Sequence, residues 1–169
     1  EPVLLEAIID RHRRPPARRG FGHQPITSQA LARGRDDAGR DAGPGAFDPA
    51  KAPPTVARVE LARYGGTWYE IARMPLWFQR NCLRSQATYG LLETGEVSVL
   101  NECDTEGGGK ESIRGSARVV AAKTNARLEV RFDNWFSVFI PSQPQGNYWI
   151  LYLDDGYQTV IVGTPDRKT

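Results

Sequence analysis

Apolar and polar residues alternate along short segments in the last two thirds of the chain. In residues 112–119 and 126–132 every second position is apolar or small, and the intervening positions are Arg, Ser or Glu. The residues on the apolar side are Ile113, Gly115, Ala117, Leu128, Val130 and Phe132. A period of two predicts β-strands with one face toward an apolar interior and one toward water.

Seven such segments, separated by turn-forming residues, predict a meander of short strands. They are residues 66–73, 86–92, 97–101, 112–119, 126–132, 147–153 and 159–163. Short, regularly spaced strands favour an antiparallel sandwich or barrel over an α/β fold. Because Gly115 and Ala117 are small, we expect an interior that is not filled everywhere. A barrel of about eight strands can just hold one small ligand.

The first 55 residues differ in composition from the rest of the 169-residue chain. They contain eight of the twelve prolines, whereas all four tryptophans and all six tyrosines lie at or beyond Tyr64. They also contain nine Lys or Arg against seven Asp or Glu, while the remainder has thirteen of each. We therefore predict a largely disordered Arg/Pro/Gly-rich extension over residues 1–55 and one domain over residues 56–169.

The start of this extension carries apolar residues at helical spacing. Together with Pro2 and the Pro15–Pro16 pair they predict a short helix within residues 2–14. The nearby arginines could contact phosphates, but acidic residues interrupt them, so we expect a solvated tail and no nucleic-acid partner. His12 and His23 have no neighbouring ligand set, and we predict neither a metal nor another cofactor.

Residues 61–73, LARYGGTWYEIAR, form the most distinctive motif. Gly66 permits a tight entry into a strand, and Trp68 presents a large ring whose N–H needs a partner. Four further motifs follow in order: QATY at 86–89, VSVLNEC at 97–103, YWILYLDDGY at 148–157 and GTPDR at 163–167. Together they resemble the lipocalin family, most closely its bacterial and apolipoprotein-D-like branch.

The resemblance implies an all-β, antiparallel up-and-down lipocalin barrel with Trp68 near its closed end. It also assigns structural roles to Gly66, Trp68, Asp154 and Tyr157. Family members continue into an eighth strand, an Arg that packs on the Trp, and a C-terminal helix. The chain ends at Thr169 without them, so we expect a barrel that is incomplete at its C-terminus.

An incomplete barrel has a consequence for the strand at 147–153. By alternation Trp149, Leu151 and Leu153 point outward, where a missing helix would leave them uncovered. The alternative is that the predicted N-terminal helix supplies the cover. We favour truncation, and expect exposed strand edges.

Cys82 and Cys103 bracket a hairpin whose turn contains Thr94–Gly95. If the turn centres near residues 93–94, Cys82 lies opposite residue 105, within reach of Cys103 across a small bulge. Relatives in this branch carry similar pairs. A disulfide would indicate an oxidising compartment, and together with the resemblance to bacterial lipocalins it implies an extracytoplasmic location, in the periplasm or at the outer membrane. The alternatives are two buried thiols, or a catalytic Cys that lacks a nearby His as its base.

Two predicted connections, residues 74–83 and 133–146, are rich in large apolar residues. They lie at the barrel end opposite Trp68. Two roles, which are compatible with each other, fit these connections: packing over the barrel, and forming an entrance for an acyl chain or a lip that faces a membrane.

These features predict binding or transport of a small hydrophobic ligand, a fatty acid or lysophospholipid-like lipid, without catalysis. The alternatives are an envelope-associated structural or interaction protein with a collapsed cavity, and a lipocalin-type enzyme. The predicted ligand contacts point inward by alternation or lie at the mouth of the barrel. They are Tyr89, Val99, Leu128, Val130, Phe132, Tyr148, Ile150, Trp77, Trp135 and Phe139.

Overall fold

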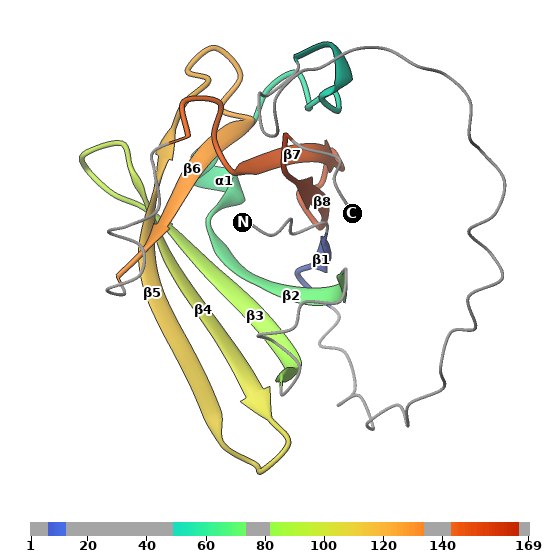
Figure 1. Ribbon diagram of the computed structural model, residues 1–169, viewed down its shortest axis with the longest axis vertical. Helices are drawn as coiled ribbons and strands as arrows, with labels where there is room; N and C mark the ends of the chain where they lie inside the picture. Colours follow the sequence, from blue (N-terminus) through green and yellow to red (C-terminus); the bar gives the residue numbers. More distant parts are fainter. Residues whose placement is uncertain (1–6, 13–48, 74–81, 134–142, 166–169) are drawn as a thin grey trace, which may run out of the picture.

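A computed structural model describes residues 7–12, 49–73, 82–133 and 143–165, which form a closed antiparallel barrel of eight strands (Figure 1). The strands are β1 (Ala7–Asp10), β2 (Gly66–Arg73), β3 (Cys82–Leu91), β4 (Val97–Thr105), β5 (Lys110–Val119), β6 (Arg127–Phe132), β7 (Tyr148–Leu153) and β8 (Thr159–Gly163). Two short helices, η1 (Pro49–Lys51) and α1 (Leu61–Tyr64), precede β2. The predicted all-β up-and-down barrel is confirmed. Among the described residues, no helix has the length and apolarity that a membrane crossing would require.

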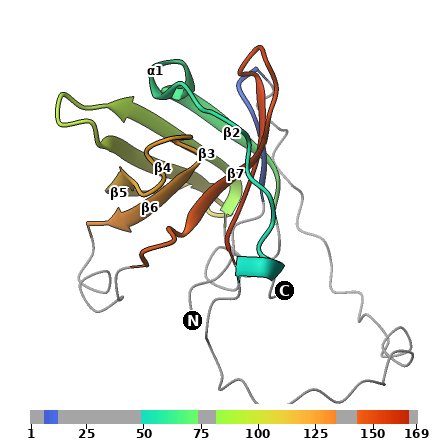
Figure 2. The same ribbon diagram turned by 90° about the horizontal axis from the view of Figure 1, so that it is seen from above.

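One end of the barrel is covered by the segment that runs into β2. Helix α1 leads directly into this strand (Figure 2). Upstream, the Val56 N–H donates to the Ile150 carbonyl at 3.0 Å, and the Val59 N–H donates to the Thr124 carbonyl at 2.7 Å. The Asn125 side chain donates to the Val59 carbonyl at 3.0 Å. The Val59 side chain is thereby fully buried against the core.

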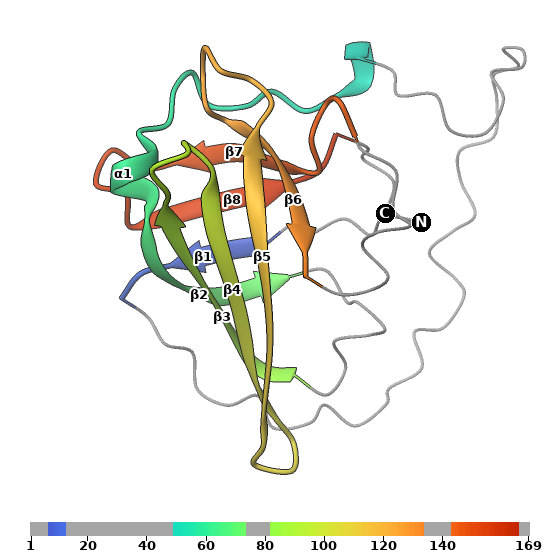
Figure 3. The ribbon, with the colours of Figure 1, turned by 90° about the vertical axis from the view of Figure 1, so that its left-hand side faces the viewer.

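Strand β1 closes the barrel, and this corrects two expectations. It pairs antiparallel with β2 on one side and with β8 on the other (Figure 3). The predicted helix is therefore wrong for residues 7–10, and the expected open barrel is wrong as well. An apolar run with β-branched residues is compatible with either helix or strand. Here it pairs with two strand edges whose N–H and C=O groups would otherwise lack partners.

Trp68 is fully buried, as predicted, and is held from two directions. Its indole N–H donates to the Tyr64 carbonyl at 2.8 Å. The guanidinium of Arg11, which directly follows β1, lies 4.3 Å from the ring centre. The same guanidinium donates to the carbonyls of Arg63, Tyr64 and Gly65. The arginine that the resemblance places on this ring, expected to be missing, is thus supplied from the N-terminal segment.

A bulge in β7 changes the faces that alternation assigned. In the register with β8, Ile150 and Tyr152 occupy successive pairs, and Leu151 has no partner. Leu153 consequently packs against the core, while Tyr152 is 50% exposed. The outward assignment of Leu153 is wrong because the extra residue reverses the alternation.

Trp149 is covered, although it does not belong to the core cluster. It is only 2% exposed, and its indole N–H donates to the Gln145 carbonyl at 2.8 Å. The Arg127 guanidinium lies 4.7 Å from its ring centre. The expectation that Trp149 would be uncovered is therefore wrong. Its cover comes from the segment before β7 and from β6.

The predicted disulfide between Cys82 and Cys103 is present, with 5.5 Å between the two Cα atoms. Cys82 lies opposite Thr105, and a register shift separates it from the next pair, as the hairpin arithmetic predicted. Gly95 has a φ of 84° in the turn. The disulfide joins β3 and β4 at the end of the hairpin opposite this turn.

Candidate ligand-binding site

A small cavity, with free space for about one water molecule, lies inside the barrel beside α1. It is lined by residues from α1, from the position after it and from five strands, namely Leu61, Tyr64, Gly65, Tyr89, Val97, Ala117, Leu128, Val130 and Tyr148. Apart from the three tyrosines, none of these side chains carries a polar atom. Its free space is far below that of typical ligand sites, which combine apolar walls with a few polar groups, so a ligand enters only if the lining side chains move apart.

The three tyrosines come from different elements and meet through their hydroxyl groups. The Tyr148 hydroxyl oxygen lies 2.7 Å from that of Tyr64 and 3.1 Å from that of Tyr89. The ring centres of Tyr64 and Tyr89 are 5.6 Å apart, and those of Tyr89 and Tyr148 are 6.1 Å apart. We call these residues the tyrosine cluster. It is the polar part of an otherwise apolar cavity.

Burial decides the ionisation state of the tyrosine cluster. Loss of hydration raises the pKa of Tyr64, Tyr89 and Tyr148 well above the ordinary phenol value, and their proximity adds to the effect for each. The hydroxyls are therefore neutral at physiological pH. They offer hydrogen bonds to a ligand but no negative charge.

Strand register and local contacts position each tyrosine. Tyr89 pairs with Gly66 on β2 and with Val99 on β4, which orients its ring inward. Tyr148 pairs with Leu128 at the short β6–β7 ladder. Tyr64 ends α1, and its ring packs 5.1 Å from that of Trp68, measured between centres.

The predicted ligand contacts fall into three groups. Four line the cavity: Tyr89, Leu128, Val130 and Tyr148. Val99, Phe132 and Ile150 belong to the core or pack against it, but they are not among the cavity-lining residues. Trp77, Trp135 and Phe139 lie outside the described residues.

Five lining residues were missed by the sequence analysis as ligand contacts: Leu61, Tyr64, Gly65, Val97 and Ala117. Val97 lies two positions before Val99, so alternation could have found it. Ala117 is one of the two small residues on the predicted inward face, and it lines the cavity. Gly115 acts differently, because a Cβ there would collide with the Arg131 carbonyl of β6. It permits close strand approach rather than enlarging the cavity.

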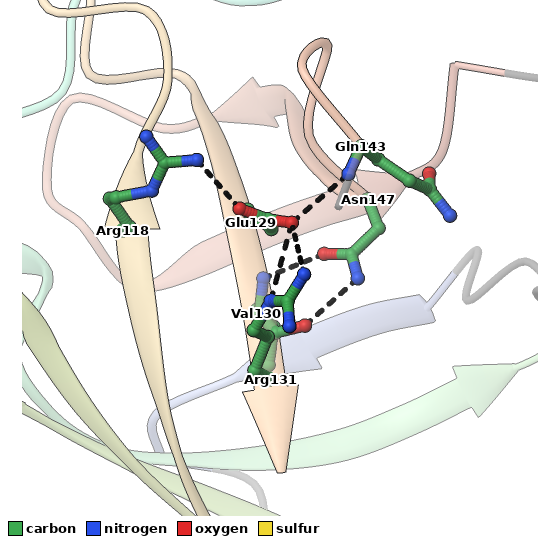
Figure 4. Close-up of polar contacts among 6 residues, drawn as sticks. All are labelled: Arg118, Glu129, Val130, Arg131, Gln143 and Asn147. Carbon is green, nitrogen blue, oxygen red and sulfur yellow. Dashed lines mark hydrogen bonds and ion pairs between the residues drawn. The ribbon is translucent and has the colours of Figure 1, made fainter. Parts of the chain in front are cut away.

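A buried carboxylate on the outer face ties the segment before β7 to β6 (Figure 4). Alternation placed Glu129 on the polar face, yet it is only 5% exposed. Its carboxylate lies 2.7 Å from Arg118 Nη2 and 3.3 Å from Arg131 Nη2. It also accepts the Gln143 backbone N–H at 3.0 Å. Two cations and a backbone donor thus compensate for its burial.

Asn147 continues the β6–β7 pairing by means of its side chain. The side-chain oxygen accepts the Val130 N–H at 2.7 Å, and the amide donates to the Val130 carbonyl at 2.9 Å (Figure 4). The backbone ladder itself joins only Arg127 to Trp149 and Leu128 to Tyr148. Asn147 therefore holds two cavity residues, Val130 and Tyr148, in place.

The β7–β8 turn is anchored by Asp154 and Tyr157. The Asp154 carboxylate accepts backbone N–H groups from Thr159, Gln158 and Gly156, and these hydrogen bonds lower its pKa. The Tyr157 hydroxyl accepts the Glu60 backbone N–H at 2.9 Å. The turn is thereby fixed to the segment that covers the barrel end.

Within the described part of the chain, no group of three or more His, Cys, Asp or Glu side chains could hold a metal ion. The cavity offers apolar surface and neutral hydroxyls. These groups suit the solvation of an uncharged molecule more than proton transfer at neutral pH.

Comparison with known proteins adds a family relationship. Residues 59–169 match the family described as "Lipocalin-like domain". The chain is 41% identical to temperature-induced lipocalin-1 of Arabidopsis thaliana, over 67% of the chain and 61% of that protein. It is 35% identical to mouse apolipoprotein D, over 60% and 50%. It is 34% identical to outer membrane lipoprotein Blc of Escherichia coli strain K12, over 66% and 59%. The chain spans half to about three fifths of the length of these relatives.

Proposed function

The chain belongs to the lipocalin family, and we propose that it binds a small hydrophobic ligand inside the barrel, without catalysis. The observation that carries this proposal is the predominantly apolar lining of the barrel interior between α1 and strands β3 to β7, where the small cavity opens further as a ligand enters. A fatty acid or a lysophospholipid-like lipid is the ligand class that we favour. Each buried methylene contributes about 0.8 kcal/mol to binding.

The proposed location is extracytoplasmic. The Cys82–Cys103 disulfide supports it, because such bonds persist mainly in oxidising compartments. One relative is by name an outer membrane lipoprotein. We propose that the protein exchanges its ligand at a membrane surface in the periplasm or at the outer membrane.

The test is titration of the protein with a dansyl-labelled fatty acid, comparing wild type with V130R. Val130 lines the cavity, so an arginine there places an unpaired charge among apolar walls and should lower affinity at least tenfold. The matched control is R114E on the exposed face of β5, which should bind like wild type. Arg118 is unsuitable as a control because it pairs with the buried Glu129.

A second cavity variant guards against misfolding of V130R. Ala117 is buried and lines the cavity, so A117L fills space without adding charge. It should weaken binding while the far-UV circular dichroism spectrum stays unchanged. Equal affinity in V130R, A117L and wild type would place the ligand elsewhere. No binding by the wild type would favour the structural envelope protein with a collapsed cavity.

A further inference from the structure

We infer that the tyrosine cluster recognises one neutral oxygen acceptor on the ligand, such as the carbonyl of a ketone, aldehyde or ester. The inference rests on the proposed function, since it concerns the same cavity. Through this hydrogen bond the site would distinguish ligands that carry an oxygen acceptor from those that do not. Its apolar walls alone would distinguish ligands only by size and shape.

The hydroxyl groups of the tyrosine cluster have one proton more than they have hydrogen bonds to each other. The three hydroxyls of Tyr64, Tyr89 and Tyr148 have three protons, and the cluster contains two hydrogen bonds. Whichever hydroxyl donates in each bond, one proton remains without an acceptor inside the cluster. No other hydrogen-bond partner exists for these hydroxyls among the residues that the structure describes. A buried donor without a partner costs roughly 1–3 kcal/mol.

The spare proton belongs to residues that border the cavity. All three tyrosines line it, together with apolar side chains only. A ligand that enters as the lining side chains move apart would accept the spare proton with its oxygen, while its carbon skeleton contacts Val97, Ala117 and Leu128. One directional hydrogen bond within apolar walls is the usual arrangement by which ligand sites fix orientation.

The absence of a cation among the lining residues favours a neutral oxygen over a carboxylate. None of the nine lining side chains is Lys, Arg or His. The nearby Arg11 guanidinium stacks on Trp68 and donates from Nη2 to three backbone carbonyls, and these contacts hold it at the barrel end, outside the cavity lining. A buried carboxylate without a paired cation costs several kcal/mol. A fatty acid therefore enters with its chain toward the cluster, whereas an ester or ketone enters with its oxygen toward it.

The cluster also predicts which substitutions abolish the effect. Replacing either Tyr64 or Tyr89 with Phe leaves two hydroxyls, one hydrogen bond and still one spare proton. Y148F breaks both bonds and leaves two spare protons. Only the triple variant Y64F/Y89F/Y148F has none. Because all the hydrogen-bonding partners are removed together, the triple variant should fold with nearly unchanged stability.

The experiment compares methyl nonyl ketone, undecane and undecanoate as competitors of a bound neutral fluorescent dye. For wild type we expect the ketone to bind more tightly than undecanoate. In the triple variant, the ratio of ketone affinity to undecane affinity should fall about fivefold, as expected for one lost hydrogen bond. Y152F, which removes a hydroxyl from an exposed tyrosine, should leave this ratio unchanged. Y148F should keep the ratio at or above the wild-type value.

The possible failures are distinguishable. If ketone and undecane both bind but their ratio is the same in wild type and the triple variant, the inference is overturned and the proposed function stands. If neither binds to the wild type, the proposed function fails and the inference with it. Undecanoate binding that equals ketone binding in wild type and weakens in the triple variant would overturn the preference for a neutral oxygen. Should the triple variant fail to fold, a fall of the ratio in Y148F would overturn the inference.

Discussion

The hairpin of β3 and β4 and the seam made by β1 are built in opposite ways. Strands β3 and β4 are ten and nine residues long, are joined by a tight turn, and carry a disulfide at the far end. Strand β1 has only four residues, and it pairs with strands that begin more than fifty residues later in the chain. The hairpin depends on local turn chemistry. The β1 seam depends on two strand edges that are already in position.

This contrast indicates where substitutions should destabilise the barrel most. Closing a long loop costs entropy that must be recovered from the contacts of a short strand. Those contacts are concentrated in few side chains, notably Ile9 and the adjacent Arg11. In the hairpin, the stabilising contacts are distributed along two long strands that pair residue by residue. We therefore expect single substitutions to have larger effects at the β1 seam than in the hairpin.

The largest effect is expected for I9A. Ile9 is only 6% exposed and belongs to the core cluster, so its truncation should lower the free energy of unfolding by about 4 kcal/mol. The matched hairpin variant L91A, at a position that is 47% exposed, should change it by less than about 0.5 kcal/mol. Urea denaturation of both proteins measures the difference. Equal small effects would mean that β1 does not close the barrel in solution.

A smaller effect is expected for R11A. The Arg11 guanidinium donates to three carbonyls and stacks on Trp68, so its loss should cost about 2 kcal/mol. R11K keeps the charge but not the planar fork, and should recover only part of this loss. Urea denaturation followed by Trp fluorescence tests the prediction. Full recovery in R11K would show that charge alone matters at this seam.

The smallest effect is expected for D154A, in the local turn between β7 and β8. The pKa of Asp154 is lowered by backbone hydrogen bonds, so its ionised form stabilises the fold above the ordinary carboxyl pKa. That stabilisation is lost as the pH falls through the lowered pKa. Because solvent screens the group, we expect a difference from wild type of less than about 1 kcal/mol at neutral pH.

Thermal unfolding of D154A at several pH values checks this prediction. The difference between wild type and D154A should shrink toward acid pH. A difference that grows as the pH falls would contradict the sign derived from the lowered pKa.

Local sequence determined most of the strands and one covalent bond. The segments 66–73 and 159–163 match β2 and β8 to the residue, because alternation and flanking glycines act within a few positions. The pairing of Cys82 with Cys103 followed from counting residues on each side of the turn. In the cavity, alternation identified Tyr89, Leu128, Val130 and Tyr148 for the same reason.

Tertiary structure decided what covers each face and which segment closes the barrel. The apolar run that includes Ile9 is compatible with a helix, and only the two open edges of β2 and β8 make it a strand. Glu129 has the sequence context of an exposed residue, but Arg118 and the segment before β7 bury it. Tyr64 enters the cavity because α1 packs across the barrel end. Alternation of apolar and polar residues predicts which way a side chain points, whereas its burial depends on segments far away in the sequence.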